Sequence, residues 1–219
     1  MRLLVAGAVT VLAVAACGAA TEPPDAPPAG EPSRPVVIDP PRINRARGHL
    51  PPDYEGAPLP QPAAPATFWS LGPGWSAEPP QCAALADPAG ADATAHGWSA
   101  SGAGGIVYAM VASAPGPPDP DVLAHCGQWT VTAENTDGTV TSTPAPPVAD
   151  AVTVAMATTV RTVVEGGTTT ITRADTVSAY LDGHVVVVAI VSDPGLPEPP
   201  LGDDYAATLL TETVSELRV

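Results

Sequence analysis

The chain of 219 residues contains no lysine, so all eight of its basic residues are arginine. This absence excludes P-loop NTPases, Schiff-base enzymes and Ser-x-x-Lys enzymes, because each needs a lysine. The sequence also lacks the His-x-x-x-His spacing of zinc proteases and the Gly-x-Ser-x-Gly turn of α/β-hydrolases. These absences favour a protein that is not an enzyme, and no cofactor is expected.

Positive charge is scarce as well, since 23 acidic residues give a formal net charge of −15. A strongly acidic chain repels nucleic acid and anionic lipid head groups. We therefore expect no nucleic-acid partner, and a monomer in solution. The lysine-free composition, rich in alanine, glycine, proline and valine, is typical of a GC-rich actinobacterial genome.

Long apolar runs are absent except at the N-terminus. Arg2 precedes an apolar run over residues 3–14, a length typical of an export signal and shorter than the ~20 residues that a membrane-spanning helix needs. The run ends in Val14-Ala15-Ala16-Cys17, which resembles the bacterial lipobox. The resemblance implies that signal peptide 1–16 is removed and that Cys17 carries a diacylglyceryl group, with its new amine open to further acylation. Two or more acyl chains would anchor the protein stably to the extracytoplasmic face of the cell membrane. The alternative is a secreted protein with a chance cysteine at the cleavage site.

Cysteine is also rare, with three in the chain. If Cys17 is lipidated, Cys82 and Cys126 remain, and an even pair outside the membrane usually forms a disulfide. Such a bridge would stabilise the fold by about 4 kcal/mol in the loop-entropy model. Two free buried thiols are the alternative. A metal site is less favoured, because two thiols and the adjacent His125 do not make a four-ligand set.

Residues 17–39 and 40–219 differ sharply in composition. The first segment is rich in proline and poor in apolar side chains, so it cannot bury enough surface to offset its ordering entropy. We expect an extended tether there, at about 3.1 Å per residue. The remainder has the size of one domain with a real core.

The last third of the domain predicts an antiparallel meander. Residues 152–164 and 168–181 are rich in β-branched side chains and are separated by a glycine pair. Asp182-Gly183 is a strong hairpin signal. Residues 185–191 are continuously apolar, which favours a central strand covered on both faces.

Further strands are expected at 106–112 and as a pair, 129–133 with 138–142, that turns at Asp137-Gly138. Short helices are expected over 40–50, over 81–86, from Asp119 to Cys126, and after Asp203-Asp204 to the end of the chain. Leu210, Val214 and Leu217 would form the buried stripe of the last helix. Helices beside a mostly antiparallel sheet predict a single α+β domain.

Three tryptophans are candidate ligand-binding residues. Trp75 and Trp98 stand in matching Gly-Trp-Ser-Ala phrases, and Trp69 lies nearby in the sequence. Exposed indole faces stack on sugars and peptides, so the three could line a groove. The alternative, favoured in a chain with one phenylalanine, is that they fill the core.

Polar clusters each have two interpretations. The arginines of residues 40–50 could bind an anion or form a solvated face, and the aspartate pairs could bind calcium, act as acid and base, or cap helices. The histidines are scattered along the chain. The residues concerned are Arg42, Arg45 and Arg47; Asp119, Asp121, Asp203 and Asp204; and His49, His96, His125 and His184.

The order of parts over residues 41–219 resembles mycobacterial lipoproteins related to the extracellular sensor domain of the receptor serine/threonine kinase PknH. The shared features are the lipobox, the proline-rich tail, and the residues Pro52-Asp53-Tyr54-Glu55, Trp98, Gly104-Gly105, Cys126, Trp129, Tyr180 and Asp193-Pro194-Gly195. The resemblance implies an α+β sensor domain with a ligand cleft. That domain has two disulfides, whereas this chain has cysteines for one, so no binding residue is carried over.

These observations favour a non-enzymatic, lipid-anchored envelope protein with a ligand-binding or sensor-like domain. Its ligand would be a lipid, a glycan or a peptide. Two alternatives remain: an envelope hydrolase whose site assembles only in space, and a module that docks on a partner protein. No metal site is expected.

Overall fold

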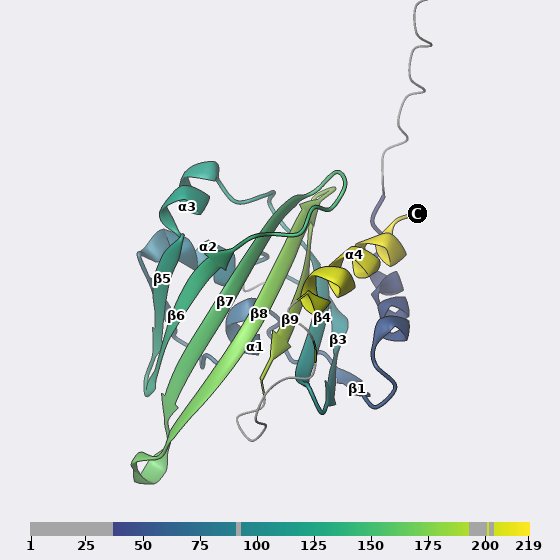
Figure 1. Ribbon diagram of the computed structural model, residues 1–219. Helices are drawn as coiled ribbons and strands as arrows, with labels where there is room; N and C mark the ends of the chain where they lie inside the picture. The colour runs from purple at the N-terminus through teal and green to yellow at the C-terminus, as the bar shows by residue number, and fades with distance from the viewer. Residues whose placement is uncertain (1–36, 91–92, 193–200, 202–203) are drawn as a thin grey trace, which may run out of the picture. The chain divides into compact units, whose positions relative to one another are not determined.

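The structure, a computed structural model, describes residues 37–90, 93–192, 201 and 204–219 (Figure 1). The expectations for signal peptide 1–16, for Cys17 and most of its tether, for Asp193-Pro194-Gly195 and for Asp203 lie outside the described residues. Ile38 is 5% exposed and already belongs to the fold, so the domain begins before Pro40.

Nine strands form one open sheet in which every neighbouring pair is antiparallel. The strand order is β1-β3-β4-β9-β8-β7-β6-β5-β2 (Figure 1). With the helices that pack on it, this sheet confirms the expected α+β fold. The strands are β1 (Glu55–Pro58), β2 (Ser76–Glu78), β3 (Ala95–Gly102), β4 (Gly105–Ser113), β5 (Gln128–Ala133), β6 (Thr136–Thr143), β7 (Val152–Val163), β8 (Thr169–Leu181) and β9 (His184–Val191).

Strand β9 lies inside the sheet, between β4 and β8, and is buried on both faces. Successive side chains of a strand point to opposite faces, so a strand covered twice needs apolar residues throughout. Residues 185–191 meet this condition, since each is less than 9% exposed. The predicted central strand and the β7–β8–β9 meander are both confirmed.

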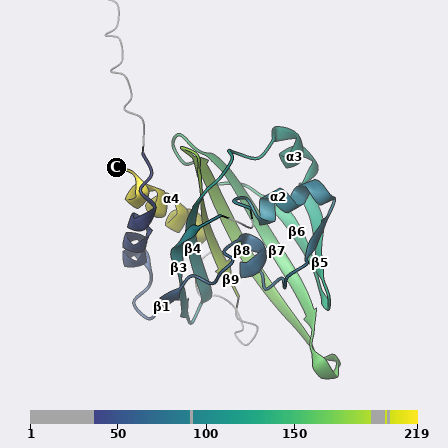
Figure 2. The ribbon, with the colours of Figure 1, turned by 180° about the vertical axis from the view of Figure 1, so that it is seen from behind.

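One face of the sheet, which we call the disulfide face, is covered by α1 (Pro65–Phe68), η2 (Pro80–Cys82) and α2 (Ala83–Ala86), seen in front of the strands in Figure 2. A short helix, α3 (Pro120–His125), lies at its margin and contributes no fully buried residue. Phe68 stacks on Tyr108 of β4 with ring centroids 4.4 Å apart.

The opposite face, the helix face, is covered by the 3₁₀ helix η1 (Pro40–His49) and by α4 (Tyr205–Leu217). The expected stripe of Leu210, Val214 and Leu217 is fully buried there. The two ends of the described domain meet on this face, because Ile38 pairs with Arg218 and Val219 N–H donates to the Val37 carbonyl at 3.1 Å.

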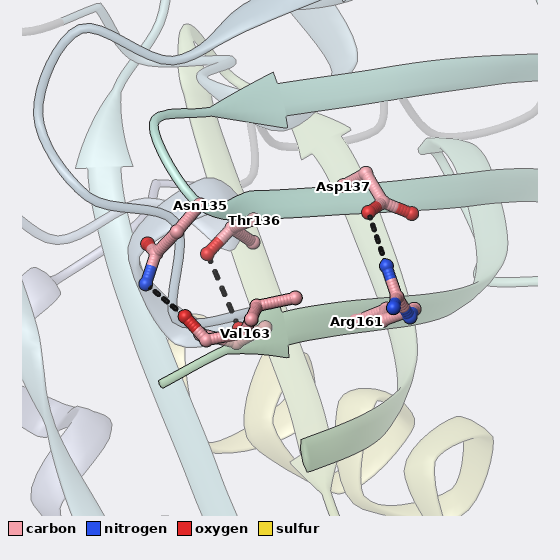
Figure 3. A network of polar contacts seen from close by, with 6 residues as sticks. Asn135, Thr136, Asp137, Arg161 and Val163 are labelled. Carbon is pink, nitrogen blue, oxygen red and sulfur yellow. Dashed lines mark hydrogen bonds and ion pairs between the residues drawn. The ribbon is translucent and has the colours of Figure 1, made fainter. Parts of the chain in front are cut away.

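The turn expected at Asp137-Gly138 was wrong, although the strand pair is present as β5 and β6. The chain turns at Glu134 and Asn135, and Asp137 lies inside β6, where its carboxylate accepts a hydrogen bond from Arg161 at 3.4 Å (Figure 3). Gly138 is required for packing, since a Cβ there would lie 2.9 Å from a methyl of Val131. The dipeptide therefore serves close contact between strands rather than a turn.

The aspartates at the helix starts behave differently from one another. The Asp119 carboxylate accepts a hydrogen bond from Asp121 N–H at 2.8 Å, which confirms the predicted cap. Asp39 and Asp204 stand at the starts of η1 and α4 but make no side-chain capping bond.

Candidate functional site

The tryptophan candidates do not form a groove. Trp69 and Trp98 are both 0% exposed, and their indole N–H groups donate to Thr176 Oγ1 and to the Ile43 carbonyl, at 2.9 Å and 3.0 Å. They lie on opposite faces of the sheet, Trp69 on the disulfide face and Trp98 on the helix face. Trp75 is half-buried against the disulfide-face core. These residues fill the two cores, which corrects the groove hypothesis.

The structure joins Cys82 and Cys126 in a disulfide, with Cα atoms 5.7 Å apart. Both half-cystines are 0% exposed. The bridge ties the end of α3 to the η2–α2 turn and so closes the disulfide face. Its role is structural, because neither sulfur is accessible from solvent.

The arginines expected on η1 do not form a common anion site. Arg42 donates to the Arg218 carbonyl, and the Arg47 guanidinium lies 5.9 Å from the Trp98 ring centroid. Arg45 is exposed. Two of the three therefore make contacts within the fold.

The histidines stay apart in the fold. His49 Nε2 lies 3.7 Å from a Glu216 carboxylate oxygen, and His125 Nδ1 lies 2.6 Å from the Asp121 carbonyl oxygen. His96 is exposed on β3. In the described ranges, no three of the His, Cys, Asp and Glu side chains lie close enough together to hold a metal ion.

His184 belongs to a surface pocket at the β8–β9 hairpin, which we call the hairpin pocket. It is open to solvent, with a volume of about 460 Å³. That volume falls within the ~300–1,000 Å³ range of small-molecule sites. The pocket is lined by Gly116, Pro117, Asp150, Ala151, Val152, Tyr180, Leu181, Asp182, Gly183 and His184.

Three separate segments build this pocket. The hairpin supplies residues 180–184, the start of β7 and the turn before it supply residues 150–152, and the loop between β4 and α3 supplies Gly116 and Pro117. Register explains part of the assembly, because Val152 pairs with Tyr180 across β7 and β8, and Tyr180 pairs with Val185 across β8 and β9. Asp150 and Asp182 both have positive φ, 57° and 48°, and stand where the chain reverses.

Tyr180 is the most buried polar side chain in the hairpin pocket, at 5% exposed. No hydrogen bond joins its hydroxyl to the part of the chain that the structure describes. Burial raises the pKa of Tyr180 far above its usual value of 10.0, since the charged form would lose its hydration. The hydroxyl is therefore neutral at physiological pH and can both donate and accept a hydrogen bond.

Asp182 links the pocket to the start of the domain. Its Oδ2 accepts a hydrogen bond from Ile38 N–H at 3.3 Å, and the His184 ring Nδ1 lies 2.7 Å from its carbonyl oxygen. Asp150 makes no hydrogen bond or ion pair within the described residues. The pocket thus carries two carboxylates, an imidazole and a phenol beside apolar walls.

Sequence reasoning missed this site. Asp182-Gly183 was assigned to a turn, which is correct, but nothing in its sequence neighbourhood indicated that Asp150 and Tyr180 would join it. The groups meet only through strand register and a loop crossing.

Two other surface depressions, of about 440 and 200 Å³, hold fewer ionisable groups. One lies between a proline-rich loop and α4, and the other at the β5–β6 turn. Neither brings an unpartnered buried side chain together with charge. Across the described ranges, every helix is too short or too polar to cross a bilayer.

Comparison with known proteins supplies a family and a fold. A solved structure of an uncharacterized protein from Mycobacterium smegmatis, the Rv0999 ortholog, is similar to this chain with a TM-score of 0.58 and 21% sequence identity. The match covers 83% of this chain and 98% of that one, and at this identity it shows a shared fold alone. No curated protein is significantly similar in sequence.

The family model whose description is "domain of unknown function (DUF5642)" matches residues 39–218, nearly the whole described domain. A match of this extent, together with the mycobacterial structure, points to a mycobacterial protein family. The chain belongs to the DUF5642 family.

Proposed function

We propose that this protein is a cell-envelope lipoprotein whose domain binds a ligand without transforming it, in the manner of a sensor-like module related to the extracellular domain of PknH. The observation that carries the binding role is the hairpin pocket. It combines ligand-sized volume, apolar walls and a buried hydroxyl that lacks a partner.

The composition of the pocket supports binding over hydrolysis. No serine, threonine or cysteine lines it, so it offers no hydroxyl or thiol nucleophile beside His184. Its openness favours a peptide or a glycan over a lipid, because an acyl chain requires a closed apolar cavity.

The address rests on the lipobox at Cys17. Mass spectrometry of the native protein should find residue 17 at the N-terminus with a diacylglyceryl adduct. An unmodified thiol at that position in material from the cytosol would contradict the proposed location.

The binding role is tested by NMR titration of the chain from residue 17 onward, with Cys17→Ser to keep it free of lipid. Envelope glycans, muropeptides and lipids are added in turn. We expect one class to shift the backbone amides of residues 150–152 and 180–184 in a saturable manner. No shift at these residues with any class at millimolar concentration would refute the proposal, and turnover of the added compound would favour the hydrolase alternative.

A further inference from the structure

The charge of the hairpin pocket is one-sided. Its lining contains two carboxylates, Asp150 and Asp182, and no arginine. Of the four carboxylate oxygens, only Asp182 Oδ2 meets a protein donor, the Ile38 N–H, within the described residues. The remaining oxygens are available to a ligand that donates hydrogen bonds.

The nearest arginine does not neutralise this charge. Arg218 donates to the carbonyl of Ala149, which precedes Asp150 in the chain. In the portion of the chain that the structure covers, the two ion pairs are His49–Glu216 and Arg161–Asp137, and neither touches the pocket. The carboxylates therefore remain without a cationic partner from this part of the fold.

A second observation is independent of the acidic pair. The Tyr180 side chain is 5% exposed, lines the pocket and makes no hydrogen bond to the described residues. Leaving a buried hydroxyl unpaired is unfavourable, so such groups normally find a partner in protein, water or ligand. A donor entering the pocket would supply that partner.

The apolar part of the lining narrows the ligand further. Pro117, Val152 and Leu181 present carbon surface beside the polar groups. Long basic side chains combine an aliphatic stem, which packs on such surface, with a charged head that needs acceptors. An ammonium group has three N–H donors and no acceptor, which suits two carboxylates and a hydroxyl oxygen.

We propose that the hairpin pocket binds a primary ammonium group at the end of an aliphatic chain, with Asp150, Asp182 and Tyr180 as its hydrogen-bond acceptors. This inference rests on the ligand-binding function proposed above and names the chemistry of its ligand. The ammonium could belong to a basic side chain of a peptide or to a free diamine, and the same experiment separates the two.

The test is an NMR titration of the Cys17→Ser chain from residue 17 with three probes. These are the peptide acetyl-Gly-Lys-Gly-amide, the same peptide with norleucine in place of lysine, and cadaverine. The lysine peptide should shift the amides of residues 150–152 and 180–184, and the uncharged norleucine peptide should bind at least about tenfold more weakly. Tighter binding of the lysine peptide than of cadaverine assigns the ligand to peptides, and the reverse assigns it to free amines.

Three variants locate the contact. Asp150→Asn, Asp182→Asn and Tyr180→Phe should each weaken lysine-peptide binding, the two aspartate changes by about tenfold. Asparagine keeps an acceptor for Ile38 N–H and tolerates positive φ, so the hairpin should persist. Glu165→Gln is the matched control, because it removes one exposed carboxylate at the other end of the β7–β8 hairpin and should leave affinity unchanged.

Equal affinity for the lysine and norleucine peptides would overturn the ammonium assignment while leaving a ligand-binding pocket in place. Equal weakening by Glu165→Gln and Asp150→Asn would also overturn it, because the attraction would then be a property of the whole acidic surface. If neither these probes nor any envelope component shifts the pocket residues, the proposed function fails as well.

Discussion

Removing the Cys82–Cys126 disulfide should be the most destabilising change that leaves the hydrophobic side chains in place. The bridge spans 44 residues of sequence, and loop closure of that length reduces the entropy of the unfolded chain by an amount worth about 4 kcal/mol at 25 °C. Domains of this kind typically unfold with about 5–15 kcal/mol. The double variant Cys82→Ala/Cys126→Ala should therefore lose a large fraction of its stability, and its Tm should fall by about 10 °C.

The loss should begin locally at α3. This helix has no buried residue, and it is held at its C-terminal end, where Cys126 N–H donates to the Val122 carbonyl and Ser142 Oγ donates to the Cys126 carbonyl, both at 2.9 Å. Without the bridge, few apolar contacts keep α3 on the sheet. Hydrogen exchange should accelerate at residues 120–126 before the rest of the domain is affected.

The assay is urea unfolding followed by the fluorescence of the four tryptophans. It compares the oxidised chain, the same chain with reductant and the double alanine variant, all with Cys17→Ser. The bridged chain should have the smaller m value, because its unfolded state exposes less surface. A loss below about 1 kcal/mol in both the reduced chain and the double variant would refute the reasoning, since the loop-entropy term would then be absent.

Two further predictions concern strand packing and alkaline pH. Gly97→Ala should cost at least about 3 kcal/mol in urea unfolding, because its Cβ would lie 2.1 Å from the Ala109 carbonyl oxygen, whereas Gly48→Ala, with open space around it, should stay within about 1 kcal/mol. Equal costs for the two glycine variants would contradict the strand-contact argument. The second prediction is that stability stays constant up to about pH 9 and falls above pH 10, because burial raises the pKa of all four tyrosines in the fold while the unfolded chain ionises near 10.0. The chain has no lysine to titrate in the same range, so urea midpoints against pH report tyrosine directly; Tyr180→Phe should flatten the fall, and a flat wild-type profile to pH 12 would contradict the argument.

The fold class could be predicted because local patterns in this sequence agree with tertiary demands. Seven consecutive apolar residues at 185–191 leave no polar side to face water, so the strand had to be covered twice. Asp119-Pro120-Asp121 starts a helix by a contact two residues long, which needs no tertiary support. Both features depend on neighbours along the chain, and both were found in the structure.

The failed prediction at Asp137-Gly138 shows the limit of that reasoning. The dipeptide is typical of a two-residue hairpin turn, but register with β7 places it inside β6 instead. Pairing of Gly138 with Val160 and packing against Val131 outweigh its local turn preference. The matching Trp75 and Trp98 phrases misled in the same way, since identical local sequence ended in different environments.

The amino-acid sequence alone determined the lysine-free chemistry, the lipobox at Cys17 as a prediction, and the alternation that makes a two-faced antiparallel sheet, because each depends on composition or on residues close together in the chain. Tertiary structure alone decided that Asp150, Tyr180 and Asp182 share a pocket. Their meeting depends on the β7–β8 register and on a loop that crosses the hairpin, and non-local pairing leaves no periodic trace in any one segment.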